Sequence, residues 1–232
     1  MASRTALIVG VGDGLSACLA RLLHKEGYSL ILAARNREKL SALAEETGAT
    51  TVSCDASEPE SVRELFDIVP SPLRVVIYNP SARQRGPLIE LDPVAAKHAI
   101  EVTAYGAFLV GQEAARAMLA QTEEAGVRGT ILFTGASAGV KGFPNSAPFA
   151  MGKFAQRGLA QSMARELHPQ GIHVGWINID GAIRNPGRTE PADRPDSMLD
   201  PDAIARTYLD LIKQDRSAWS NEITVRPWVE TF

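Results

Sequence analysis

The chain alternates between short, uninterrupted apolar runs and longer segments whose apolar residues recur at helical spacing. The first run, Thr5–Val9, stops at Gly10, and Leu15, Cys18 and Leu19 then begin an apolar helical face. Strands are predicted at the continuous runs: Thr5–Val9, Ser29–Ala33, Thr50–Ser53, Arg74–Tyr78, Thr130–Thr134, His173–Ile179 and Glu222–Val225. Helices are predicted between them: one that ends at Gly27, then Arg37–Glu46, Glu58–Val69, Pro93–Thr122, Pro148–Leu167 and Pro201–Lys213.

Strands that are apolar on both faces and separated by amphipathic helices are typical of a parallel sheet covered by helices on both sides. The chain has no internal repeat or linker-like stretch. We therefore expect one α/β domain, residues 1–232, with a doubly wound parallel sheet of about seven strands and ligand sites at the C-terminal strand ends. Residues 184–199 form the one long irregular segment, and this length favours a lid over the substrate site.

Composition and charge exclude several function classes. The formal net charge of −3 argues against nucleic-acid binding, which needs a net basic face. No apolar stretch approaches the roughly 18 residues that cross a bilayer, and the N-terminus has no signal-peptide pattern, so we expect a cytoplasmic protein with no membrane partner. Cys18 and Cys54 lie in apolar runs and are expected to pack rather than pair. The histidines show no ligand spacing, so no metal site is predicted.

A glycine-rich turn, residues 10–16, joins the first predicted strand to the first helix. Glycines in such a turn let the backbone approach a pyrophosphate, whose charge the helix N-terminus favours. A strand-to-helix turn without a ligand is the alternative, but the position after the first strand of an α/β sheet favours binding. The predicted contacts to a dinucleotide come from Gly10, Gly12, Asp13, Gly14 and Leu15.

The spacing of this turn resembles the Gly-x-x-x-Gly-x-Gly motif of the short-chain dehydrogenase/reductase family. Gly10 and Gly14 match, and Ser16 replaces the third glycine. Four further family motifs resemble segments that follow in the same order over essentially the whole chain: Ala33-Ala34-Arg35-Asn36, Cys54-Asp55-Ala56, Val76-Ile77-Tyr78-Asn79-Pro80-Ser81 and Asp180-Gly181-Ala182-Ile183-Arg184-Asn185. The resemblance implies a Rossmann-like fold and a nicotinamide coenzyme.

The residue after the second strand bears on which coenzyme is bound. Family members that prefer NAD(H) carry an acid there for the ribose hydroxyls, whereas this chain has Arg35. Arginine geometry suits a 2′-phosphate, so we expect NADP(H) rather than NAD(H). The alternative is a solvated surface arginine at a helix start.

The resemblance implies three further groups of coenzyme contacts. Asp55 and Ala56 match the segment that contacts adenine, although Asp55 is also placed to act as the N-cap of the next helix. Asn79 matches a residue that braces the sheet and touches the ribose. Gly181 and Ile183 match the segment that contacts the nicotinamide carboxamide.

The family's catalytic set is incomplete in this chain. Family members reduce a carbonyl with a tyrosine acid, a lysine four residues later that lowers the tyrosine pKa, a serine that steadies the substrate oxygen, and an asparagine. The matching positions carry Phe149, Lys153, Ala136 and Thr103. A shift of one residue would put Ser137 at the serine position. Lys153 also bonds the nicotinamide ribose in the family, so coenzyme binding alone explains its presence.

Two functional hypotheses follow. The first is an NADP(H)-dependent oxidoreductase of this family type, acting on an unidentified small molecule, with protonation by water, Lys153 or the substrate itself. The second is a non-catalytic NADP(H)-binding regulatory or scaffold protein. We favour the first. Tyr78, Tyr105 and Ser146 offer other hydroxyls, but each is expected to pack or cap. The resemblance also implies a homodimer or homotetramer formed through the two long helices.

Overall fold

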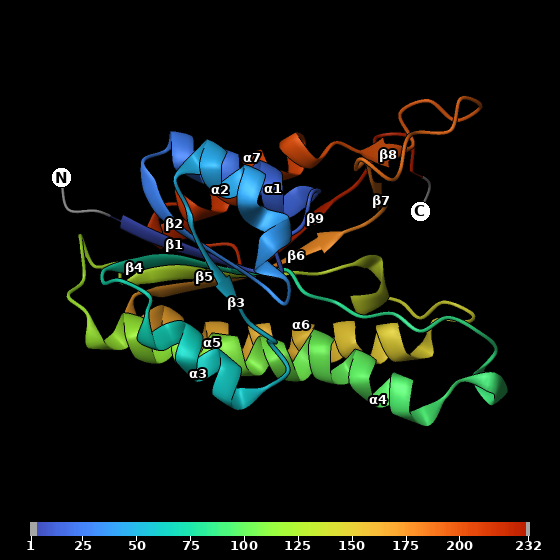
Figure 1. The fold of residues 1–232 in the computed structure, drawn as a ribbon, viewed down its shortest axis with the longest axis horizontal. Coiled ribbons are helices and arrows are strands. Elements are labelled where there is room, and N and C mark those ends of the chain that lie inside the picture. Colours follow the sequence, from blue (N-terminus) through green and yellow to red (C-terminus); the bar gives the residue numbers. More distant parts are fainter. Residues whose placement is uncertain (1–3, 231–232) are drawn as a thin grey trace.

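The computed structural model describes residues 4–230 and contains a seven-stranded parallel sheet between two layers of helices (Figure 1). The strands are β1 (Arg4–Val9), β2 (Tyr28–Ala34), β3 (Thr50–Ser53), β4 (Leu73–Tyr78), β5 (Gly129–Thr134), β6 (Ile172–Ile179) and β9 (Glu222–Val225). Their spatial order is β3-β2-β1-β4-β5-β6-β9, and every pairing is parallel. The predicted doubly wound sheet is therefore confirmed, with its switch point between β1 and β4.

Helices cover both faces of the sheet (Figure 1). On one face lie α1 (Leu15–Lys25), α2 (Ser41–Thr47) and α7 (Pro201–Ile212); on the other lie α3 (Pro59–Asp67), α4 (Pro93–Ile100), α5 (Gly106–Ala120) and α6 (Ala147–Leu167). Within β1, Leu7 and Val9 join the apolar cluster under α5, while Ala6 and Ile8 join the cluster under α1. Both faces of the strand are buried, which explains why its sequence is apolar without alternation.

The predicted single helix over Pro93–Thr122 is wrong in its middle, because a π-helical turn at Glu101–Tyr105 separates α4 from α5. Two side-chain contacts hold this turn. The buried Tyr78 hydroxyl donates to the carbonyl of Val102, and the Thr103 hydroxyl accepts a hydrogen bond of 3.1 Å from the amide of Ala82. Both contacts join residues more than twenty positions apart, so helical periodicity could not predict the interruption.

A second difference lies after β2. The segment predicted as one helix, Arg37–Glu46, begins as a 3-10 turn over Arg37–Leu40 before α2 starts at Ser41. The Asn36 side chain accepts a bond from the amide of Glu38 and caps this turn. Arg35 therefore lies between the end of β2 and this 3-10 turn.

The long irregular segment is held at both of its ends. β7 (Ala182–Ile183) pairs with β8 (Met198–Leu199) in a separate two-stranded parallel ladder. Residues 184–197 therefore begin and end next to each other, beside the C-terminal end of β6. This arrangement positions the segment beside the strand ends where ligands are expected.

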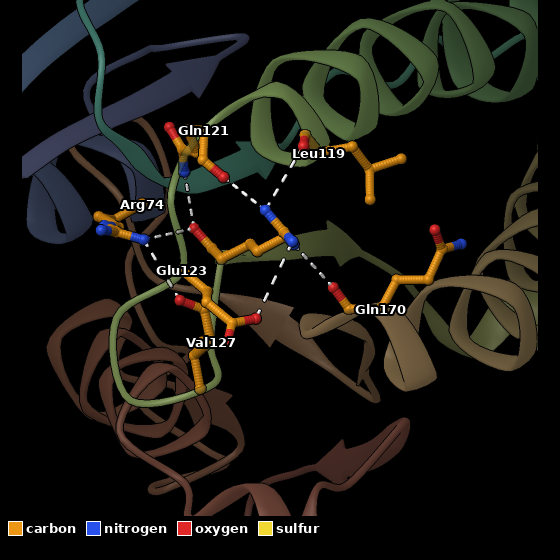
Figure 2. A network of polar contacts seen from close by, with 7 residues as sticks. Arg74, Leu119, Gln121, Glu123, Val127 and Gln170 are labelled. Atoms are coloured by element: carbon orange, nitrogen blue, oxygen red, sulfur yellow. Dashed lines mark hydrogen bonds and ion pairs between the residues drawn. The ribbon is translucent and has the colours of Figure 1, made fainter.

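At the N-terminal ends of the strands, a polar network holds the loop between α5 and β5 (Figure 2). The Gln121 amide donates 2.7 Å bonds to the carbonyls of Leu73 and Arg128. The Arg128 guanidinium in turn donates to backbone carbonyls at Leu119, Gln121 and Gln170. The network provides hydrogen-bond donors for loop carbonyls where the parallel strands begin. It therefore lies at the end of the sheet opposite to the C-terminal strand ends.

Candidate functional site

The turn between β1 and α1 has the backbone form that requires glycine. Gly10 has a φ of +80°, and a Cβ there would lie 2.6 Å from the ring of Pro80. Gly14 is the N-cap residue of α1 and has no side chain to cap it. The first amides of α1 are therefore left for a ligand, as at other anion-binding helix starts.

Ser16, at the position of the family's third glycine, is a buried brace. Its hydroxyl donates a 3.2 Å bond to the Gly10 carbonyl and accepts a 2.6 Å bond from the Asn79 side chain. The backbone amide of Asn79 also donates a hydrogen bond to the carbonyl of Val9. The Ser16 hydroxyl thus connects the glycine turn to the residue that follows β4. Its role goes beyond leaving space for a ligand. The sequence showed that a serine replaces the family's third glycine here, but it did not predict these bonds.

Two hollows of about 340 and 430 Å³ meet over this turn and form one trench along the C-terminal edge of the sheet. Both are lined by Gly10, Val11, Gly12, Asp13, Asn79 and Ser81. Gly14 and Leu15 line only the first hollow, beside Lys153, and Arg35 lines only the second. The trench has the form of a two-part ligand site with a glycine turn at its middle, which fits a dinucleotide.

The second hollow holds the residues predicted at the adenine end. Arg35 and Asp55 line it together with Ala56, Asn36 and Lys39. Within residues 4–230, neither Arg35 nor Lys39 forms an ion pair. Lys39 was not predicted, since nothing in its local sequence distinguishes it from the other charges of a surface segment.

The alternative role of Asp55 as a helix N-cap is wrong. The N-cap of α3 is Glu58, and the Asp55 carboxylate instead accepts bonds of 3.0 and 2.6 Å from the amide and hydroxyl of Ser57. The pKa of Asp55 is lowered chiefly by the Ser57 hydroxyl. Pro59 opens α3 and moves the helix start beyond the reach of Asp55.

The first hollow holds the residues predicted at the nicotinamide end. Lys153 lies here with Thr134, Gly181, Ile183 and Asn185. Gly181 has a φ of +155°, and a Cβ there would lie 3.0 Å from Leu199 and Pro227. The segment after β6 therefore passes close to the cleft with little side-chain bulk. The trench as a whole fits the extended coenzyme that the motifs imply.

Lys153 is 2% exposed although it borders the hollow. Its ammonium donates a 2.5 Å bond to the Thr134 carbonyl and a 3.3 Å bond to Oε1 of Gln156. Gln156 in turn donates to the Thr103 carbonyl inside the π turn. Burial, and then the charge of Arg83, lower the pKa of Lys153 from 10.5 to about 7. This lysine changes charge near neutral pH.

The other positions of the family's catalytic set surround Lys153 but carry no hydroxyl that faces it. Phe149 and Ala136 line the same hollow as Lys153. Ser137, the possible substitute, borders the neighbouring hollows instead and opens a 3-10 turn over Ser137–Gly139. The Thr103 hydroxyl is engaged with the amide of Ala82.

The remaining hydroxyl candidates lie elsewhere. Tyr78 is fully buried and bonded to Val102, and burial raises its pKa far above the usual range. Tyr105 is 44% exposed and stacks on Phe108, outside the trench. Ser146 precedes α6 and borders only a third hollow, which Phe149 also lines and which we call the outer hollow. None of these residues lines the hollow that contains Lys153.

Two arginines complete the cleft. The ζ carbon of Arg83 lies 4.0 Å from the ring centroid of Phe149, and Arg188 lines the same hollow from the long segment between β7 and β8. Arg83 was missed, because it follows β4 by five residues and no periodic or motif signal connects it to Phe149.

Two absences concern the described part of the chain alone. Between residues 4 and 230, no group of three or more His, Cys, Asp and Glu side chains is arranged to hold a metal ion. No helix in the same range is long and apolar enough to cross a membrane.

The fold, the glycine turn and the buried lysine agree with the sequence comparisons. Residues 4–189 match the model of the short chain dehydrogenase family. The chain therefore belongs to the short-chain dehydrogenase/reductase family, whose members are oxidoreductases that bind a nicotinamide coenzyme.

Relatives of this chain extend over nearly its full length. A short-chain dehydrogenase from Rhodopseudomonas palustris is 34% identical, with 97% of this chain and 99% of that chain covered and a TM-score of 0.82. A metagenomic short-chain oxidoreductase solved in complex with NADP is 26% identical, with coverages of 97% and 98% and a TM-score of 0.83. An uncharacterized oxidoreductase of Staphylococcus aureus is 28% identical over 98% of both chains.

Proposed function

We propose that this oxidoreductase binds NADP(H) in the trench and interconverts a carbonyl compound and its alcohol without the family's tyrosine acid. The observation that carries the proposal is the continuity of the trench, with Arg35 and Lys39 in one half, Lys153 in the other and the glycine turn between them. The coenzyme contacts predicted from the sequence are part of this proposal.

The preference for NADP(H) over NAD(H) rests on the charge at the adenine end. Arg35 follows β2 directly, and Lys39 lies in the adjoining 3-10 turn, so two cations without ion-pair partners among the described residues border one hollow. A 2′-phosphate would accept charge-assisted bonds from them. The NADP complex of the metagenomic relative supports the same choice.

Calorimetric titration with NADP⁺ and NAD⁺ tests this preference. Replacing Arg35 by Ala removes a charged hydrogen-bond partner worth about 1.5–3 kcal/mol, so we expect NADP⁺ to bind about 10- to 150-fold more weakly, with little change for NAD⁺. Arg37→Ala is the matched control, because Arg37 is exposed and lies outside the hollow. Equal loss of both coenzymes in R35A, or no binding of either by the natural protein, would refute the assignment.

Proton delivery falls to Lys153 in this proposal. Reduction places a hydride on the carbonyl carbon, which the bound coenzyme supplies, and a proton on the oxygen. An ammonium has three N–H groups, and two of those on Lys153 are taken by Thr134 and Gln156, so one remains for the cleft. With a pKa of about 7, Lys153 retains its proton below neutral pH and releases it readily. We expect kcat/KM for reduction to fall as the pH rises through about 7.

The second candidate is a coenzyme-binding protein without catalysis. Phe149 and Ala136 favour it, because the loss of a positioned acid and of an oxygen-stabilising donor each costs about 10²-fold or more in rate. The two candidates separate in one assay. Oxidation of NADPH by the natural protein with a panel of carbonyl compounds supports the enzyme, whereas tight NADPH binding with no turnover on any member supports the regulatory or scaffold role.

We further propose that the long helices mediate a homodimer or homotetramer and that residues 184–199 act as a lid. Tyr105, at the end of the π turn, and Phe108 on α5 are more than 40% exposed, as are Met151 and Phe154 on α6. Apolar side chains at this exposure are typical of a surface that another subunit covers. Sedimentation of the natural protein and of F108E tests the assembly, since a charge in a buried interface should shift it toward the monomer.

A further inference from the structure

We infer that the substrate is a carbonyl compound, or the corresponding alcohol, that carries an anionic oxygen group held by Arg83 and Arg188. The group is a carboxylate or a phosphate, located within a few bonds of the reacting carbon. This inference rests on the proposed function, because it places the reaction beside Lys153 in the same trench.

Position is the first support. Arg83 and Arg188 both line the hollow that contains Lys153, and both also line the adjoining outer hollow. Phe149 and Ala136 line the two hollows as well. The two arginines therefore lie where the hollow beside Lys153 and the outer hollow share their lining, next to the position at which a substrate would react.

Charge is the second support. Arg85 joins Arg83 and Arg188 in the outer hollow, and none of the described residues that line it is an aspartate or glutamate. Within residues 4–230 none of the three arginines forms an ion pair. Burial lowers the pKa of Arg83, and the charges of Arg85 and Arg188 lower it further. A fold that holds like charges together without a carboxylate beside them gains stability when an anion binds.

The arginines of the segment between β7 and β8 do not all face the cleft. Arg184, which lies four residues before Arg188, pairs instead with Asp200 at 3.2 Å and does not line the hollows. Arg188 comes into the cleft because the Asn185 and Arg188 backbones exchange two hydrogen bonds that close a tight turn. The Asn185 side chain also accepts a 2.9 Å bond from the amide of Gly187.

Phe149 has a defined task in this arrangement. Its ring carries the Arg83 guanidinium at 4.0 Å, and the Lys153 ammonium lies 6.0 Å from the same ring centroid. A guanidinium resting on an aromatic face keeps its N–H edge free for a bidentate contact with a carboxylate or phosphate. Because Arg83 and Lys153 lie around one ring, the anionic group and the carbonyl of the substrate must be close to each other.

The bond changes leave the anionic group untouched. Reduction adds a hydride to the carbonyl carbon and a proton to its oxygen, while the coenzyme is oxidised. The carboxylate or phosphate remains paired with the two arginines throughout. The arginine charges also favour the negative oxygen that develops before protonation, which partly replaces the missing serine and tyrosine hydroxyls.

Matched pairs of charged and neutral carbonyl compounds test the inference on the NADPH-loaded protein. The probes are pyruvate against methyl pyruvate for the carboxylate, and dihydroxyacetone phosphate against dihydroxyacetone for the phosphate. We expect the charged member of at least one pair to have a kcat/KM at least 10-fold higher, and the pair that responds identifies the anionic group. Arg83→Gln and Arg188→Gln should each lower kcat/KM for the charged member much more than for its neutral partner, so that most of the preference is lost. An equal loss for both members would overturn the inference.

Binding of oxamate and of inorganic phosphate to the NADP⁺-loaded protein, measured by calorimetry, provides a second readout that needs no turnover. Binding that both Arg variants weaken at least 10-fold supports the site, while Arg206→Gln, which removes an exposed charge of α7, should leave it unchanged. Arg83→Lys retains the charge and should give an intermediate loss if the Gln variant fails to fold. A protein that binds NADP⁺ but no oxyanion, or that binds it equally in all variants, would overturn this inference alone. Failure to bind NADP⁺ would overturn the proposed function.

Discussion

Replacement of Lys153 by Met should change how the stability of the protein depends on pH. Burial lowers the pKa of this lysine from 10.5 to about 7, so between these values the unfolded chain holds a proton that the folded protein has released. Stability therefore rises with pH across this range, because the unfolded state binds more protons. Lys153→Met has no such group, so its unfolding free energy should lack this contribution.

The magnitude follows from the two pKa values. Full separation of the folded and unfolded titrations corresponds to about 1.4 kcal/mol per pH unit. Near pH 7 the folded lysine is about half protonated, so the expected gain of the natural protein over the variant from pH 7 to pH 9 is about 2 kcal/mol. The other ionisable groups are common to both proteins and cancel in the difference.

Urea unfolding of both proteins without coenzyme, at several pH values from 7 to 9, measures this difference. Lys97→Met is the control, since its amine is exposed on α4 and paired with Glu101; its curve should run parallel to that of the natural protein. Parallel curves for Lys153→Met and the natural protein would show that the buried ammonium retains its proton. The reasoning about proton delivery at neutral pH would then be wrong.

Three further predictions concern single features. Gly10→Ala should destabilise the protein by about 2–4 kcal/mol in urea unfolding, because the left-handed backbone and the clash with Pro80 add to one another; a loss below 0.5 kcal/mol would contradict this geometry. Arg128→Leu should cost about 1–3 kcal/mol by unmaking the loop bonds of Figure 2, and an unchanged thermal midpoint would contradict it. The double variant Phe149→Tyr with Ala136→Ser should raise NADPH-dependent ketone reduction at least 100-fold; no gain despite retained NADPH binding would show that more than the two hydroxyls is missing.

The sequence alone determined the architecture and identified residues that line both parts of the trench. Strands buried on both faces carry an unmistakable apolar signal, and Gly10 and Arg35 lie at strand ends where the fold fixes their place. These features depend on residues close together in the chain. For the same reason Lys153 and Phe149, four residues apart on one helix, were found as a pair.

Only the tertiary structure decided which other side chains meet them. Arg83 lies on Phe149 although 66 positions separate them in the sequence, and Arg188 enters the cleft while Arg184 is drawn away by Asp200. The π turn likewise depends on Tyr78, which belongs to a distant strand. Contacts of this kind leave no periodic trace in the sequence, because each is set by the packing of elements that the chain brings together only when it folds.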